Sequence, residues 1–170
     1  MYGHRDEFFG YACRRTPFVA GALGYAAGTG ASTVHVTANP PDDLRVDVTV
    51  AISPVVGPEV VMGSTRMKAA TAQKMVLNML TTTAMVRIGK VYENMMVDLM
   101  ATSEKLRERG KRILMISEGF GYEEAASWLG RAEGSVKRAI VMHRTGLDVR
   151  KARERLAAVG GSVRKAIENG

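Results

Sequence analysis

Residues 56–74, VGPEVVMGSTRMKAATAQK, decide the fold, because an apolar start typical of a buried strand leads through a Gly-Ser-Thr turn into a long helix. The first turn of a helix carries unpaired backbone N–H groups and the positive end of the helix dipole. Ser64 and Thr65 add hydroxyl groups at this point, and Arg66 and Lys68 add positive charge. The pattern therefore predicts an anion site at the start of the helix, with a sugar phosphate as the natural ligand.

The same residues have a purely structural alternative. A serine or threonine before a helix commonly accepts hydrogen bonds from the backbone of that helix and binds nothing else. Glu59 precedes the turn in a Gly-Pro-Glu sequence, where its carboxylate can accept sugar hydroxyls, act as a base or simply face solvent. The chemistry of these residues leaves the alternatives open.

The composition fits one ordinary domain, or one domain with a small appendage. The chain has 170 residues, of which 46% are hydrophobic, and this is enough to bury a core. The N-terminal residues MYGHRDEFF are too charged for a secretory signal, and no apolar run is long enough to span a membrane. We expect a cytoplasmic protein without a membrane segment.

Neither a metal nor a cofactor is expected. Cys13 is the only cysteine, which we interpret as a small apolar side chain, and His4, His35 and His143 are widely separated. Residues 104–170 hold 15 Lys and Arg against nine Asp and Glu. This basic segment lacks the interleaved aromatic residues of a nucleic-acid surface, so a nucleic-acid partner is disfavoured.

The hydrophobic pattern predicts an α/β fold with a parallel sheet. A helix is expected over 17–27, followed by strands over 32–37 and 46–52, with no further strand of the sheet in the chain. A long helix over 64–90 has apolar residues on nearly every side, which requires it to be buried or paired.

The pattern of the C-terminal part predicts a separate helical module. We expect Thr102 to cap a helix that ends near Ile116, with short amphipathic helices beyond Gly119. Residues 134–140, GSVKRAI, recur as residues 161–167, GSVRKAI. This internal repeat predicts two copies of a helix, a tight glycine turn and a second helix, a pattern that reports packing rather than a ligand.

Residues 57–109, GPEVVMGSTRMKAATAQKMVLNMLTTTAMVRIGKVYENMMVDLMATSEKLRER, closely resemble the N-acetylmuramic acid 6-phosphate etherase family. The glucokinase regulatory protein is a distant relative of that family. The resemblance begins near Arg15-Thr16-Pro17 and extends to the C-terminus, so it corresponds to the second half of a family member.

The resemblance implies a fold and its boundaries. Residues 15–117 would be part of a doubly wound sugar isomerase (SIS) domain, and 118–170 a small three-helix module like ubiquitin-associated domains. Residues 1–14 resemble no part of the family. The helix over Met67–Lys90 corresponds to a dimer contact in the family, so a homodimer, or a separately supplied N-terminal half, is expected to cover it.

The resemblance also implies a lyase of amino-sugar metabolism and cell-wall recycling. The family eliminates D-lactate from N-acetylmuramic acid 6-phosphate and adds water, giving N-acetylglucosamine 6-phosphate, without a cofactor. The residues expected to contact the substrate are Ser64, Thr65, Arg66, Lys68, Glu59 and, from the family's Ser-Gly-Arg-Thr-Pro loop, Thr16.

The resemblance assigns no catalytic residue to this chain. The two acid/base glutamates of the family lie upstream of the Arg-Thr-Pro loop and match no residue here, which leaves the catalytic residues unknown and Glu59 as the one candidate. Cys13-Arg14 also replaces the Ser-Gly of the family loop. We therefore expect a truncated etherase; the alternatives are a non-catalytic sugar-phosphate-binding regulator, or a protein-interaction role of residues 119–170.

Overall fold

The computed structural model describes residues 7–12, 16–40 and 47–168. Cys13, His4 and the start of the predicted strand at Val46 lie outside the described residues. The chain divides into two compact units, one ending at Leu80 and the other beginning at Thr81. Each unit is described by itself.

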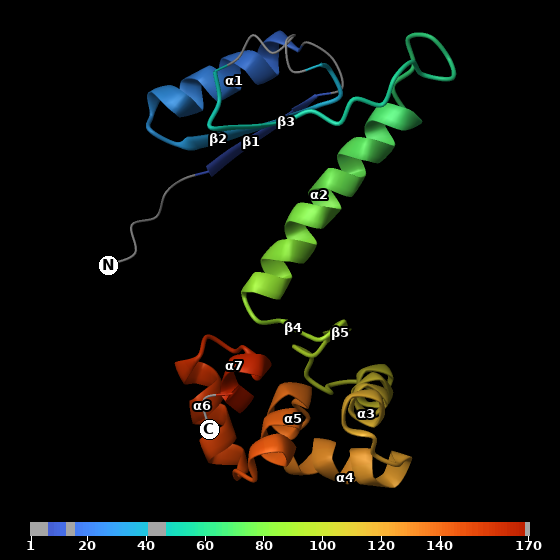
Figure 1. Ribbon diagram of the computed structural model, residues 1–170, viewed down its shortest axis with the longest axis vertical. Helices are drawn as coiled ribbons and strands as arrows, with labels where there is room; N and C mark the ends of the chain where they lie inside the picture. The colour runs from blue at the N-terminus through green and yellow to red at the C-terminus, as the bar shows by residue number, and fades with distance from the viewer. Residues whose placement is uncertain (1–6, 13–15, 41–46, 169–170) are drawn as a thin grey trace. The chain divides into compact units, whose positions relative to one another are not determined.

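The first unit contains a three-stranded parallel sheet with one helix packed against it (Figure 1). Its elements are β1 (Glu7–Ala12), α1 (Pro17–Gly28), β2 (Ser32–Thr37) and β3 (Val50–Ile52), with β2 in the centre. Proline at the first helical position favours the start of α1, since its missing N–H has no partner there in any case. The predicted helix, the strand over 32–37 and the parallel sheet are confirmed.

Two predictions about this unit are wrong, and a third is confirmed only in part. The sheet has a third strand, β1, in the segment that was expected to contribute none. The strand predicted over 46–52 is formed only by Val50–Ile52 within the described part. Residues 53–67 form an irregular loop rather than a buried strand.

The physical reason for the irregular loop is its backbone chemistry. Pro54 and Pro58 have no N–H to donate to a strand ladder, and Gly57 has a φ of 71°, which no strand adopts. The apolar residues that suggested burial are exposed, and Met62 is 98% exposed. The apolar composition of residues 53–67 therefore does not indicate a buried strand.

The long helix α2 (Lys68–Arg87) crosses the boundary between the two units. It begins four residues later than predicted, because the backbone N–H of Ser64 donates to the carbonyl of Val61 in a turn. Within this chain only Ala69 and Val76 of α2 are buried. Most of its other large apolar side chains, including Met75 and Met79, are exposed, although the sequence required them to be covered.

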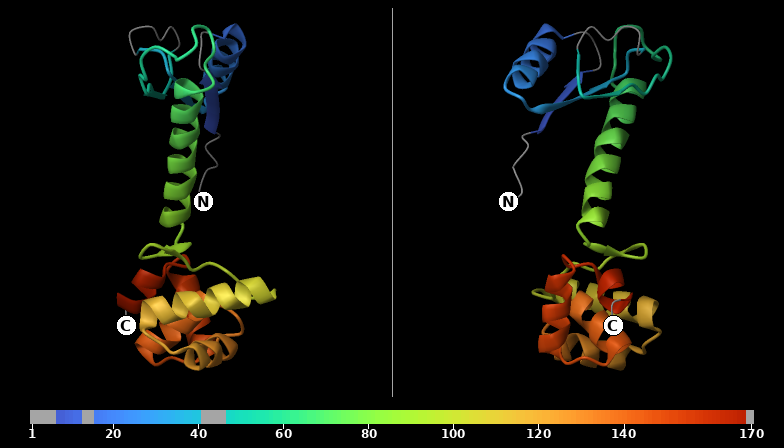
Figure 2. Two further views of the ribbon diagram at one scale, coloured as in Figure 1. Left: turned by 90° about the vertical axis from the view of Figure 1, so that its right-hand side faces the viewer. Right: turned by 60° about the vertical axis from the view of Figure 1, so that its left-hand side comes forward.

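The second unit is a helical bundle preceded by a short antiparallel hairpin (Figure 2). The hairpin consists of β4 (Val91–Tyr92) and β5 (Met95–Met96). The helices are α3 (Glu104–Glu118), α4 (Tyr122–Arg131), α5 (Val136–Thr145), α6 (Val149–Ala158) and α7 (Val163–Glu168). The buried apolar residues form one cluster that includes Val97, Ile113, Leu114, Ala125, Leu129, Val136, Ile140, Val141, Ala152, Leu156 and Val163.

The helix start predicted at Thr102 is displaced by one residue. Ser103 caps α3, because its Oγ accepts a hydrogen bond from the backbone N–H of Leu106 at 3.3 Å. The helix then extends two residues past Ile116 and ends at Gly119, whose φ of 76° is typical of a glycine helix cap.

The internal repeat is confirmed as two copies of helix, glycine turn and helix. In each copy a glycine with positive φ, Gly134 or Gly161, donates its N–H to the carbonyl of a buried leucine at 2.8–2.9 Å. The next residue, Ser135 or Ser162, accepts the N–H three residues later at 3.4 Å. The repeated Gly-Ser-Val sequence therefore stops one helix and starts the next.

The described structure is thus a mixed α/β protein with a small parallel sheet. The assignment of an SIS domain, of a ubiquitin-associated-like module and of the boundary near residue 117 remain predictions. No helix among residues 7–12, 16–40 and 47–168 has the length and apolar character that a membrane span requires.

Candidate functional site

The predicted site lies where the 53–67 loop enters α2, and the side chain of Glu59 occupies it. Oε2 of Glu59 accepts the backbone N–H of Lys68 at 3.0 Å, and Oε1 accepts that of Ala69 at 3.0 Å. A carboxylate at the start of a helix is stabilised by these N–H groups and by the helix dipole. The anion expected at this helix start is therefore already present within the chain.

The hydrogen bonds from the backbone of α2 favour the ionised form of the Glu59 carboxylate. The N–H of Ala69, followed by that of Lys68, holds the pKa of Glu59 below its usual value, against a smaller opposing effect of burial. Glu59 is thus ionised at neutral pH, and it must give up these bonds before it can accept a proton.

The next two N–H groups of α2 are also paired within the chain. The N–H of Ala70 donates to the carbonyl of Thr65 at 3.0 Å, and that of Thr71 to the carbonyl of Met67 at 3.3 Å. The unpaired N–H groups that the sequence suggested here are therefore satisfied by the loop itself. A ligand at this position would have to rely on side chains, or displace Glu59.

The predicted cation Lys68 also closes the loop. Its Nζ donates to the carbonyl of Pro58 at 2.8 Å. Arg66 is exposed, and Ser64 and Thr65 are half-buried in the turn that leads into α2. The structure thus brings Glu59 and Lys68 into mutual contact across the loop and leaves Arg66 exposed.

Thr16 belongs to another element but to the same edge of the sheet. It is the N-cap residue of α1, and its carbonyl accepts the N–H of Ala20 at 3.2 Å. It follows β1, and the 53–67 loop follows β3, and these strands run parallel through β2. Both segments therefore leave the carboxyl edge of the sheet, where open α/β sheets bind their ligands.

Sequence reasoning missed the structural use of Glu59. A carboxylate a few residues before a helix is a common partner for the first N–H groups of that helix, and this signal was available from the spacing of Glu59 and Lys68. The substrate contacts assigned to Ser64, Thr65, Arg66, Lys68, Glu59 and Thr16 remain predictions.

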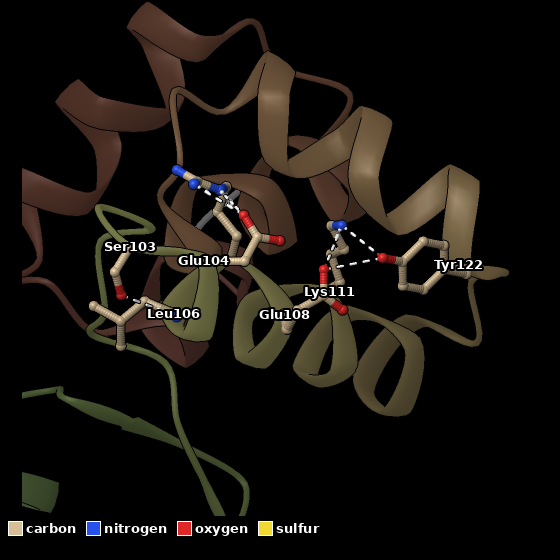
Figure 3. A network of polar contacts seen from close by, with 7 residues as sticks. Ser103, Glu104, Leu106, Glu108, Lys111 and Tyr122 are labelled. Atoms are coloured by element: carbon tan, nitrogen blue, oxygen red, sulfur yellow. Dashed lines mark hydrogen bonds and ion pairs between the residues drawn. The ribbon is translucent and has the colours of Figure 1, made fainter.

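A second polar cluster, on α3 and α4, has a structural explanation (Figure 3). Lys111 Nζ donates to Glu108 at 2.7 Å and to the Tyr122 hydroxyl at 2.8 Å, and this hydroxyl donates to Glu108 at 2.9 Å. Glu108, and then Tyr122, raise the pKa of Lys111. All three residues line one shallow cavity on this face, and their hydrogen bonds join α3 to the start of α4.

In the part of the chain that the structure describes, no group of three or more His, Cys, Asp and Glu side chains lies close enough together to hold a metal ion.

Comparison with known proteins identifies close relatives. No family model matches the chain. A protein of Salinibacter ruber named N-acetylmuramic acid 6-phosphate etherase is 59% identical over 155 residues, which cover 91% of this chain and 50% of the relative. The protein of the same name from Salmonella paratyphi B is 51% identical over 158 residues, which cover 93% of this chain and 53% of that relative. The chain thus spans about half the length of the curated relatives it matches, and that half is the C-terminal one.

Proposed function

From its homology to the C-terminal half of the N-acetylmuramic acid 6-phosphate etherase family, we propose that the chain acts in the etherase reaction by holding the phosphorylated amino sugar. The proposed substrate is N-acetylmuramic acid 6-phosphate, and the proposed products are D-lactate and N-acetylglucosamine 6-phosphate. The reaction removes a proton from the sugar and breaks the ether bond, so that D-lactate leaves with the ether oxygen. Water then adds to the resulting double bond.

One structural observation supports this proposal beyond the homology. Thr16 follows β1 and the 53–67 loop follows β3, so both segments leave the carboxyl edge of the parallel sheet, and the loop carries the hydroxyl groups of Ser64 and Thr65 and the exposed residue Arg66. Arg66 is suited to a phosphate, because its planar fork of N–H groups pairs with two oxygens at once. Ser64 and Thr65 supply hydroxyl donors beside it.

The test is a coupled assay for D-lactate with the purified chain, N-acetylmuramic acid 6-phosphate and the Arg66→Ala variant. We expect the chain to bind the sugar with an affinity, measured by calorimetry beside the assay, that falls about tenfold or more in Arg66→Ala, since a charge-assisted phosphate contact is worth about 1.5–3 kcal/mol. Arg131→Ala, which removes a guanidinium stacked on Trp128, is the matched control and keeps the wild-type affinity.

The assay separates two parts of the proposal. If the chain binds the sugar but releases no D-lactate, then the binding role stands and this chain does not catalyse the elimination by itself. If Arg66→Ala binds and turns over the sugar as the wild type does, then the proposed phosphate contact is wrong.

We also propose that a second copy of the chain covers the exposed apolar side chains of α2, among them Met75, Met79, Met85 and Val86. Burial of such side chains drives association. Sedimentation of the purified chain as a monomer at micromolar concentration would contradict this.

A further inference from the structure

Glu59 and Lys68 form a double clamp at the base of the loop. The Glu59 carboxylate receives the N–H groups of Lys68 and Ala69, and the Lys68 ammonium donates to the carbonyl of Pro58. These contacts join the short segment 58–59 to the segment 68–69. They therefore close a ring of chain that contains residues 60–67.

The apolar side chains at the start of this segment are largely exposed. Val60 is 76% exposed, Val61 64% and Met62 98%. A segment with exposed apolar side chains and little packing depends on its hydrogen bonds for a fixed conformation. The clamp supplies three such bonds at the base of the loop, beside the backbone bonds from Ser64 to Val61 and from Ala70 to Thr65. Ser64, Thr65 and Arg66 lie between the two ends of the clamp.

We propose that Glu59 is a positioning residue, which holds residues 60–67 against the start of α2 and so presents Ser64, Thr65 and Arg66 to the phosphorylated sugar. This inference rests on the proposed function. A carboxylate whose two oxygens both accept backbone N–H groups is engaged in structure, so its role differs from that of a general base. It contributes to substrate binding by reducing the conformational freedom that the loop would lose on binding.

The first experiment needs no ligand. Backbone ¹⁵N relaxation is measured at Ser64, Thr65 and Arg66 in the wild type, in Glu59→Gln and in Glu59→Ala. We expect the order parameters to fall most in Glu59→Ala, which removes both acceptors. Glu59→Gln gives a smaller fall, because its amide oxygen still accepts one N–H. Unchanged order parameters in Glu59→Ala would overturn the proposal.

The second experiment measures the affinity for N-acetylmuramic acid 6-phosphate by calorimetry with the same variants. We expect binding to weaken about tenfold in Glu59→Ala and less in Glu59→Gln. Where turnover is measurable, KM rises and kcat stays near the wild-type value. Glu123→Gln, which changes an exposed carboxylate in the first turn of α4, is the control and binds as the wild type does.

The outcomes are distinguishable. Wild-type affinity in Glu59→Gln together with a large fall in kcat would make Glu59 a catalytic residue and overturn the positioning role. Absence of sugar binding by the wild-type chain would reject the proposed function instead, and the relaxation measurement would then decide alone whether Glu59 holds the loop. Circular dichroism of each variant verifies that the fold is intact.

Discussion

At the scale of single residues, Asp98 of the second unit forms ion pairs with two lysines. Its carboxylate contacts Lys137 Nζ at 2.8 Å and Lys90 Nζ at 2.5 Å. Burial raises the pKa of Asp98, but hydrogen bonds from Lys137 and Lys90 outweigh this and leave the pKa below its usual value. Only 11% of the Lys137 side chain is exposed, so its charge depends on Asp98 for a partner.

We predict that Asp98→Asn lowers the free energy of unfolding by about 1–3 kcal/mol, because it leaves a nearly buried ammonium without its counter-charge. Urea unfolding at pH 7, followed by the fluorescence of Trp128, measures this. Glu104→Gln removes the exposed pair with Arg107 and is the control, with an expected change below about 0.5 kcal/mol. Equal effects of the two substitutions would contradict the prediction.

His35 makes the stability of the first unit depend on pH. It lies on β2 with only 8% of its surface exposed, and burial lowers its pKa. The imidazole of His35 therefore binds a proton more tightly in the unfolded chain than in the folded chain. The stability contributed by neutral His35 is complete above about pH 6.5 and declines as the pH falls below it.

We predict that His35→Leu reduces the loss of stability between pH 7 and pH 5, as measured by urea unfolding with circular dichroism. An unchanged loss in the variant would contradict this.

At the scale of elements, Gly89 sets how the chain enters the β4–β5 hairpin. Its φ is 74°, and a Cβ added there would lie 2.9 Å from the backbone nitrogen of Ser162. Gly119 has nearly the same φ, 76°, but no atom within 4 Å of an added Cβ. The two glycines therefore separate the cost of backbone conformation from the cost of a steric clash.

We predict that Gly119→Ala costs about 1–2 kcal/mol of stability from its left-handed backbone alone. Gly89→Ala is expected to cost about 1–3 kcal/mol more, because the turn between α6 and α7 must move to accept the methyl group. Thermal unfolding followed at Trp128 compares them. Equal costs would show that the contact between Gly89 and Ser162 is not maintained in solution.

The elements also show what the sequence can predict. The helix over 17–27, the strand over 32–37 and the repeated glycine turns were predictable, since periodicity, proline, glycine and capping serine all favour the same structure at those positions. The 53–67 loop was not, because its apolar residues favour a strand while Pro54, Gly57 and Pro58 prevent one. β1 was missed because no resemblance or strong pattern covers residues 7–12.

The candidate site was predictable in location but not in its hydrogen bonding. Glycine, hydroxyl and basic residues before a helix pointed to the start of α2. Only the structure shows that Glu59 and the loop backbone already pair with the first N–H groups, because this depends on the path of residues 60–67 rather than on local preference.

At the scale of the whole molecule, most of the buried apolar side chains that the structure describes lie in the second unit. The large buried cluster lies between Val97 and Ala166, entirely within the second unit. In the first unit, the described buried apolar residues are few: Leu23, Ala26, Val36, Ala69 and Val76. The second unit is therefore expected to fold without the first.

We predict that a fragment of residues 81–170 is folded on its own and unfolds in a single cooperative transition. Its Trp128 stacks on Phe120 with the ring centroids 5.8 Å apart. We expect Trp128 to keep the fluorescence emission maximum that it has in the whole chain. A fragment that lacks a cooperative thermal transition would contradict the division of the molecule into these units.

The most direct test of the proposed function is calorimetric titration of the whole chain with three sugars: N-acetylmuramic acid 6-phosphate, N-acetylmuramic acid and N-acetylglucosamine 6-phosphate. We predict that both phosphorylated sugars bind and that the unphosphorylated one binds at least tenfold more weakly, since the phosphate supplies the charge-assisted contacts. Failure to bind either phosphorylated sugar, or equal affinity for all three, would contradict a phosphosugar site in this half of the family's sequence.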